Sequence, residues 1–170
     1  MNRILVIGSS GSGKSTFARQ LAQRLDLPLV SLDYHYWQPG WVPTEEPVWQ
    51  ARVAELVAKD RWVIEGNYAS TFPLRMPRAD TIIWLDPPRL LCLWGAVRRW
   101  WQHRGKETRD DMAPGCPEKI DWEFVKYIWT FPEQINPQNE AALRDYATHA
   151  RIFRVTSRRE AANLLETLDA

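Results

Sequence analysis

The chain has 170 residues, of which 45 % are hydrophobic and 25 % are charged, and these values are typical of one globular domain. They exclude a disordered, fibrous or coiled-coil chain. The 22 Lys and Arg against 21 Asp and Glu leave a net charge of +1, which offers no general attraction to nucleic acid or to an anionic membrane. We therefore expect a single domain over residues 1–170, a monomer or homodimer with no membrane partner and with nucleic acid disfavoured.

The cysteine content and the N-terminus favour a reducing compartment. Cys92 and Cys116 are the two cysteines, too few for a disulfide framework and wrongly spaced for a zinc site. Residues 1–7 lack the apolar stretch of a signal peptide, and no apolar run approaches the ~20 residues of a membrane span. We expect two free thiols and a cytoplasmic location.

The N-terminal half of the chain alternates between strand and helix patterns. Residues 4–7 are a continuous apolar run that ends in a Gly/Ser cluster, which predicts a strand buried on both faces. A helical pattern then begins at Lys14 and is stopped by Pro28. The next segments predict a strand, a helix and a strand, at residues 29–32, 45–58 and 62–64 respectively.

The C-terminal half continues the same alternation around one irregular insertion. Residues 81–85 predict a fourth strand, which must end before Pro87-Pro88 because consecutive prolines cannot continue a central ladder. A helical stripe runs from Leu90 to about Trp101. Repeated Gly and Pro in residues 103–119 predict a mobile insertion. The remaining segments predict helices at 123–128, 139–149 and 160–168 and a fifth strand at 152–155.

Strands that are separated by helices need crossover connections, which favour a parallel sheet covered on both sides. The sequence therefore predicts a three-layer α/β sandwich. In such sheets, ligands bind at the carboxyl ends of the strands.

The strongest motif lies at the end of the first predicted strand. Residues 8–15 read Gly-Ser-Ser-Gly-Ser-Gly-Lys-Ser and match the phosphate-binding pattern G-x-x-x-x-G-K-[ST] in its strand-to-helix context. The glycines let backbone N–H groups surround a phosphate, and the following helix adds its positive end. Lys14 is expected to reach the β- and γ-phosphates and Ser15 to ligate Mg²⁺. The predicted nucleotide contacts are Gly8, Ser10, Gly11, Ser12, Gly13, Lys14, Ser15 and Thr16.

Transfer of a phosphoryl group needs cations that neutralise its oxygens, on a segment that can close. A run of cations extends from the helix that follows the fourth strand into the insertion, at Arg98, Arg99, Arg104, Lys106 and Arg109. The planar fork of Arg suits phosphate, so we expect catalytic roles for Arg99 and Arg109. The pattern does not choose between Arg98 and Arg99.

Two carboxylates follow the second and third predicted strands and are expected to overhang the phosphate loop. Asp33 is a candidate to orient or deprotonate an acceptor hydroxyl, and its alternative role is a turn or helix cap. If the acceptor is already a phosphate, no base is needed and Asp33 only positions it. The second carboxylate is Glu65.

Two further groups have open interpretations. Four aromatic residues around Pro39-Gly40 either stack on a base or sugar or form a small core with Trp49 and Trp62; they are Tyr34, Tyr36, Trp37 and Trp41. Arg75 and Arg78 either grip an anion of the acceptor or lie on the surface.

The sequence resembles the adenylate-kinase-like P-loop kinases, in particular the adenylate-kinase-related or DNA topology modulation (FlaR-related) proteins. The resemblance spans nearly the whole chain and rests on residues 8–16, 32–41, 62–68, 79–86 and 108–119. It implies a P-loop kinase fold with strand order 2-3-1-4-5, ATP as the donor and an arginine-bearing lid. The acceptor-side region then covers about residues 34–60 and the lid about residues 103–119.

The resemblance also implies roles for single residues. Glu65 occupies the place of an acid that supports Mg²⁺ through water, and Arg98 or Arg99 matches an arginine of adenylate kinases. Arg158 falls where related kinases hold adenine through backbone contacts. Glu in place of Asp, and the lack of the following Phe-Pro-Arg, weigh against AMP as the acceptor.

These observations favour a Mg²⁺- and ATP-dependent kinase that acts on a nucleoside monophosphate or a hydroxylated metabolite. One alternative is an ATP-binding regulatory or DNA-associated protein without phosphoryl transfer. Another is an NTPase switch, which is disfavoured because no apolar run that ends in Asp has an evident water-positioning Gln nearby, although Leu85-Asp86 resembles the end of such a run.

Overall fold

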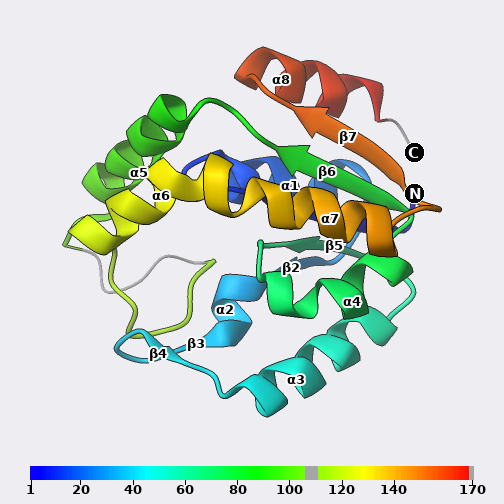
Figure 1. Ribbon diagram of the computed structural model, residues 1–170, viewed down its shortest axis with the longest axis horizontal. Coiled ribbons are helices and arrows are strands. Elements are labelled where there is room, and N and C mark those ends of the chain that lie inside the picture. The colour runs from blue at the N-terminus through cyan, green and yellow to red at the C-terminus, as the bar shows by residue number, and fades with distance from the viewer. Residues whose placement is uncertain (106–110, 169–170) are drawn as a thin grey trace.

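The computed structural model describes residues 1–105 and 111–168. Its centre is a sheet of five parallel strands in the order β2-β5-β1-β6-β7 (Figure 1). The strands are β1 (Arg3–Gly8), β2 (Leu29–Ser31), β5 (Trp62–Glu65), β6 (Thr81–Leu85) and β7 (Arg151–Val155). A separate antiparallel ribbon pairs β3 (Trp37–Gln38) with β4 (Val42–Pro43).

Helices connect the strands and cover the sheet. The longer helices are α1 (Lys14–Arg24), α3 (Glu46–Ala58), α5 (Arg89–His103), α6 (Trp122–Gln134), α7 (Asn136–Tyr146) and α8 (Arg158–Thr167). Short helical segments follow β2 and β5, namely α2 (Leu32–Tyr36), η1 (Ala69–Thr71), α4 (Phe72–Arg75) and η2 (Met76–Arg78).

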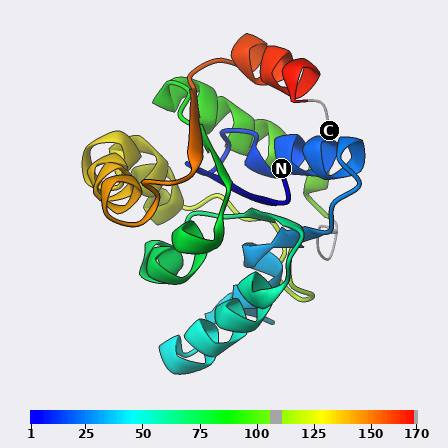
Figure 2. The same cartoon turned by 90° about the vertical axis from the view of Figure 1, so that its right-hand side faces the viewer.

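Alternating residues of the strands belong to two separate hydrophobic cores, one on each face of the sheet. Leu5 and Ile7 of β1 pack with residues from α3, α4 and α7 on one face, whereas Ile4 and Val6 pack with α1 on the other. The period of two along a strand explains this division. Figure 2 shows the sheet between these two layers of helices.

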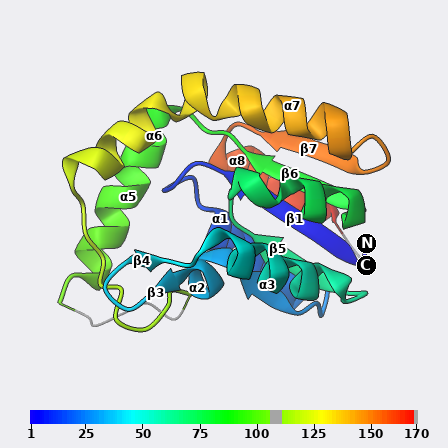
Figure 3. The same ribbon diagram turned by 60° about the horizontal axis from the view of Figure 1, so that its bottom comes forward.

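The sheet has helices beyond its carboxyl ends as well as on its faces. Figure 3 shows α5 and α6 at the end of the molecule toward which β1 and β6 run. The loop that follows β1 therefore opens toward α5, which places the phosphate-binding sequence between the sheet and this helix.

The predicted fold class is confirmed. The five strands of the main sheet have the predicted order 2-3-1-4-5 when they are counted along the chain, and the ribbon accounts for the higher strand numbers. The ribbon itself was not predicted, because its two-residue strands are too short to show a period.

The helices at 123–128 and 139–149 were predicted with wrong bounds. The first, α6, continues to Gln134 although it contains Pro132, and the second, α7, begins earlier at Asn136. Burial of Ile128 and Phe131 favours the longer α6, and Pro137 is tolerated in the first turn of α7 because no intrahelical N–H is needed there. Within the described residues, no helix is long and apolar enough to cross a membrane.

Candidate active site

The phosphate loop joins β1 to α1 with its backbone donors free. Gly11 and Gly13 have φ angles of +74° and +95°, which glycine adopts without strain. In the described part of the chain, the N–H groups of Gly11, Gly13 and Lys14 have no protein acceptor, and the buried Oγ of Ser12 also has no partner. Free N–H groups at the start of an eleven-residue helix form an anion-binding site.

Lys14 brings an ammonium group to this loop. Its Nζ donates to the carbonyl oxygen of Ser9 at 2.9 Å. Burial lowers the pKa of Lys14, and the carboxylates of Glu65 and Asp33 oppose this shift. The three charged side chains from β1–α1, β5 and α2 thus meet at the carboxyl ends of neighbouring strands, as the sequence predicted.

Glu65 lies at the end of β5 among hydroxyl groups. Its Oε1 accepts hydrogen bonds from Ser31 Oγ at 2.8 Å and from Ser15 Oγ at 3.3 Å, and the residue is 3 % exposed. Burial and the neighbouring Asp33 raise the pKa of Glu65, while Lys14 opposes them.

The oxygen donors of Ser15 and Glu65 fit Mg²⁺, which proteins hold with few side chains plus substrate phosphates and waters. The described residues contain no group of three or more His, Cys, Asp and Glu that could hold a metal ion. A Mg²⁺ ion at this place would therefore share its coordination with the nucleotide.

Asp33 faces the loop that follows β5. Its Oδ1 accepts a hydrogen bond from the hydroxyl of Tyr68 at 2.7 Å. Burial is the main cause that raises the pKa of Tyr68, and the charge of Asp33 is the second. The hydroxyl therefore stays protonated and donates the hydrogen bond. Tyr68 has a φ angle of +29°, a conformation that non-glycine residues rarely adopt.

A buried arginine holds this unusual loop. Arg75 is 0 % exposed; its Nε donates to Thr71 Oγ1 at 2.8 Å, its Nη1 to the Gly66 carbonyl at 3.1 Å, and its Nη2 to the Asn67 and Tyr68 carbonyls at 2.6 and 2.8 Å. Both sequence-based interpretations of Arg75 are wrong, because this side chain lies neither on the surface nor free to bind an anion. Nothing in the local sequence marks a buried arginine that binds backbone carbonyls.

Asn67 ties the same loop to the phosphate loop. Its Oδ1 accepts from the N–H of Gly8 at 3.3 Å, and its Nδ2 donates to Asn139 Oδ1 of α7 at 3.2 Å. Sequence analysis did not single out Asn67 or Tyr68 as functional residues. Their signal was their position directly after a buried strand.

A cavity of about 600 Å³ extends from the phosphate loop. It lies between the start of α1, the face of α5 and the start of α8. Many of the predicted nucleotide contacts line it, together with both candidate arginines of α5: Gly11, Ser12, Gly13, Lys14, Ser15, Thr16, Arg98, Arg99 and Arg158. Gly8 and Ser10 belong to the same loop but are not among the described residues that line this cavity.

The cavity contains side chains that the sequence did not indicate. Gln102, His103 and Asp111 line it, and Arg99 forms an ion pair with Glu118 at 3.1 Å. Arg98 and Arg99 both reach the cavity, so the structure does not separate these alternatives. Arg109 lies outside the described residues.

Helix α5 contacts the backbone of the phosphate loop directly. A Cβ atom added to Gly95 would lie 2.2 Å from the Gly11 carbonyl oxygen, and one added to Gly11 would lie 2.0 Å from the Cys92 carbonyl oxygen. Only glycines allow this approach. The helix that carries Arg98 and Arg99 is thus fixed to the loop that would hold the phosphates.

Comparisons with known proteins agree with this geometry. A family model described as an AAA domain matches residues 4–84, and no curated protein matches the sequence. A shikimate kinase from Acinetobacter baumannii in complex with shikimate is similar in structure, with a TM-score of 0.62 and 17 % identity over 99 % of this chain and 90 % of that one. An unliganded sugar kinase from Janibacter sp. HTCC2649 has a TM-score of 0.54 and 17 % identity over 98 % of this chain and 91 % of that one.

The similar solved structures show that this chain shares its fold with small-molecule kinases. A shikimate kinase from Bacteroides thetaiotaomicron is also similar, with a TM-score of 0.53 and 17 % identity over 98 % of this chain and 95 % of that one. None of these comparisons distinguishes the adenylate-kinase-related group.

In this P-loop kinase-like fold, three of the four aromatic residues around Pro39-Gly40 are half-buried and pack against other side chains of the protein. Tyr36 contacts Trp49 and Tyr68 with ring centroids 5.1 and 4.7 Å apart. Trp37 and Trp41 contact each other at 5.4 Å and pack on a small buried cluster formed by Met112, Ala113 and Cys116. The small-core interpretation is therefore the better one for these residues, whereas Tyr34 is 48 % exposed.

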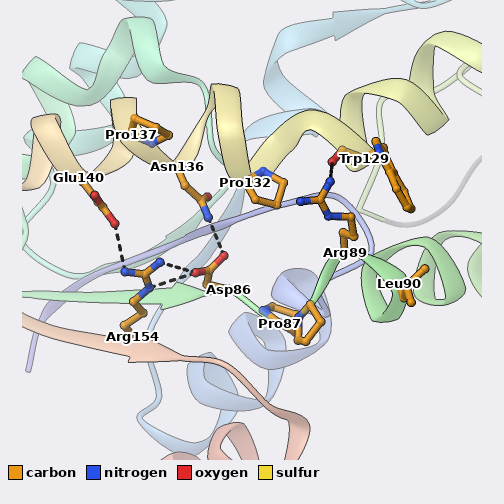
Figure 4. A pocket seen from close by; sticks show the side chains of 11 residues that line it. Asp86, Pro87, Arg89, Leu90, Trp129, Pro132, Asn136, Pro137, Glu140 and Arg154 are labelled. Carbon is orange, nitrogen blue, oxygen red and sulfur yellow. Dashed lines mark hydrogen bonds and ion pairs between the residues drawn. The ribbon is translucent and has the colours of Figure 1, made fainter.

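A second cavity, of about 650 Å³, lies between β6, β7 and the α5–α7 helices. There Asp86 accepts hydrogen bonds from Arg154 Nη2 at 2.6 Å and from Asn136 Nδ2 at 2.8 Å (Figure 4). Asp86 lines this cavity and is not among the described residues that line the phosphate-loop cavity. This arrangement gives no support to an NTPase switch built on Leu85-Asp86.

Proposed function

We propose that the protein transfers the γ-phosphoryl group of ATP, with Mg²⁺, to a small-molecule acceptor. The observation that carries this proposal is the phosphate loop with unpaired N–H groups, beside which Lys14, Glu65 and Asp33 converge. The structural neighbours titled shikimate kinase and sugar kinase support the same reaction class. The proposed subtype is adenylate-kinase-like.

In this proposal, the loop N–H groups and Lys14 bind the phosphates, and an arginine of α5, Arg99 with Arg98 as the alternative, neutralises the transferred group. Ser15 and Glu65 would hold Mg²⁺, which supplies charge neutralisation when it is bound. Asp33 orients the acceptor. Arg158, which lines the cavity, would lie beside the adenine.

Two further parts of the proposal concern larger segments. Residues 34–60 form the acceptor side and residues 103–119 a lid whose Arg109 contacts the phosphoryl group in the closed state. The buried unpaired thiols of Cys92 and Cys116 support a reducing, cytoplasmic setting.

The experiment is acceptor-dependent release of ADP from Mg·ATP, measured with a mixture of nucleotides and hydroxylated metabolites. We expect turnover by the wild-type protein and none by Lys14→Ala, because this ammonium serves the ligand. Lys126→Ala removes an exposed lysine of α6 and should keep full turnover. Equal turnover by wild type and Lys14→Ala would contradict the proposal.

A further inference from the structure

The arginines around the acceptor side bind the protein's own backbone. Each guanidinium nitrogen of Arg75 has an acceptor within the protein. Arg78 donates from Nε and Nη2 to the carbonyls of Val57 and Ala58, both at 3.2 Å, at the end of α3. Arg52 donates to the carbonyl of His35. These three side chains hold the acceptor-side elements together, and Arg75 has no guanidinium nitrogen left for a ligand.

Negative charge, in contrast, is concentrated where an acceptor must approach the γ-phosphate. Asp33 and Glu65 lie close together. Burial is the main cause of the raised pKa of Glu65, and the charge of Asp33 is the second. An acceptor that carried its own phosphate or carboxylate would add a third negative group beside them, and like charges at such a site repel. Sites that bind phosphate or carboxylate groups normally contain arginine side chains, whose guanidinium groups donate paired hydrogen bonds and balance the negative charge.

Several cations of the described residues line the phosphate-loop cavity, on the proposed donor side. They are Lys14, Arg19, Arg98, Arg99 and Arg158. These cations lie beside the proposed place of the triphosphate, whereas Asp33 and Tyr68 are not among the described residues that line this cavity. The charge distribution thus separates an anionic donor from the acceptor.

Asp33 is arranged to receive a neutral partner. Tyr68 is the one side chain in the described part of the chain that donates to it, and it does so at Oδ1. Oδ2 is therefore available to accept a hydrogen bond from a ligand. A carboxylate accepts from a hydroxyl and repels a phosphate.

We infer that the acceptor is an alcohol that carries no phosphate or carboxylate group. This inference rests on the proposed function and narrows its acceptor class. In the transfer, the alcohol oxygen forms a bond to the γ-phosphorus of ATP, and the bond from this phosphorus to the β,γ-bridging oxygen breaks. ADP leaves with that electron pair, and the hydroxyl proton passes to Asp33.

Matched pairs of acceptors test the inference with the wild-type protein. The pairs are nucleosides and their 5′-monophosphates, glucose and glucose 6-phosphate, and the cyclic polyol myo-inositol and the cyclic hydroxy acid shikimate. Acceptor-dependent ADP release gives kcat/KM for each compound, and calorimetry of Mg·ATP on the same preparation measures donor binding. We expect a neutral member to be phosphorylated with kcat/KM at least about 100-fold above that of its anionic counterpart, because the anion meets Asp33 and Glu65 and none of the described arginines is seen to compensate for its charge there.

The outcomes separate the inference from the proposed function. Equal or greater kcat/KM for the anionic members, or turnover confined to them, overturns the inference and leaves the kinase proposal intact. Binding of Mg·ATP with no transfer to any compound of either class overturns both the inference and the transferase function. A protein that does not bind Mg·ATP contradicts the proposed function at its first step.

Discussion

Asp33 and Tyr68 come from different strand ends and meet through one hydrogen bond of 2.7 Å. Tyr68 fixes one carboxylate oxygen, and the rings of Tyr36 and Trp49 pack against Tyr68 at 4.7 and 5.1 Å. The hydrogen bond therefore fixes the orientation of the Asp33 carboxylate. Such fixed geometry is what a group that handles an acceptor proton requires.

Asp33→Asn tests this role at the residue scale. The amide keeps an oxygen for Tyr68 but cannot take a proton, so we expect kcat to fall by about 10² to 10⁴-fold with the Kd for ATP unchanged. Steady-state kinetics with the acceptor from the matched pairs and calorimetry with ATP measure the two effects. Tyr68→Phe, which keeps the ring packing, should give a smaller fall in kcat, and an unaltered kcat in Asp33→Asn would rule out the role.

At the scale of elements, two contacts fix the segments around the phosphate loop. The first is the set of hydrogen bonds from Arg75 to the loop that follows β5. The second is the approach of Gly95 in α5 to Gly11. The first contact holds a loop without regular secondary structure, and the second joins residues that are distant in sequence. We therefore expect both contacts to stabilise the structure around the site.

Arg75→Met removes the first support. The carbonyls of Gly66, Asn67 and Tyr68 would lose a buried donor, and we expect the free energy of unfolding to fall by about 3 to 5 kcal/mol. Urea unfolding followed by circular dichroism measures it. Arg78→Met, which removes two hydrogen bonds from a half-buried side chain, should cost about 1 kcal/mol. Equal effects of the two changes would show that Arg75 does not have this special role.

Gly95→Ala tests the second support. In an ordinary helix, Gly→Ala stabilises by about 0.5 to 1 kcal/mol, but here the methyl group would meet the Gly11 carbonyl. We therefore expect a loss of about 1 to 3 kcal/mol in unfolding free energy together with weaker ATP binding. Val97→Ala, at an exposed position of the same helix, should alter neither quantity much. A stabilised Gly95→Ala protein with normal ATP affinity would refute the contact.

For the whole molecule, local patterns in the sequence were sufficient to predict the strands and the phosphate loop, whereas the strand order was implied by the family resemblance. Continuous apolar runs such as residues 4–7 and 81–85 are buried strands, and the glycine motif lies between β1 and α1 as its pattern requires. The meeting of Lys14, Asp33 and Glu65 followed from the rule that parallel strands end at the same edge of a sheet. These features depend on residues that are neighbours in sequence or on a general property of the fold.

The remaining features depend on tertiary contacts that no local pattern records. Arginine is usually a surface residue. Arg75 is buried because the folded loop directs the carbonyl groups of Gly66, Asn67 and Tyr68 toward its guanidinium group. Gly95 is one glycine in a helical stripe, and its role depends on Gly11, which lies 84 positions away in sequence. The extension of α6 past Ile128 likewise depends on burial of Phe131, which overrides the effect of Pro132.

The central claim is that the backbone from Gly8 to Thr16 binds the triphosphate of a nucleotide with Mg²⁺. Isothermal titration of the wild-type protein with Mg·ATP tests it most directly, with Lys14→Ala as the comparison. The account predicts saturable binding at one site, weakened about 10- to 100-fold in Lys14→Ala, because a hydrogen-bonded charge pair with the phosphates is lost. Absence of binding heat with either Mg·ATP or Mg·GTP, or equal affinity of the two proteins, would contradict it.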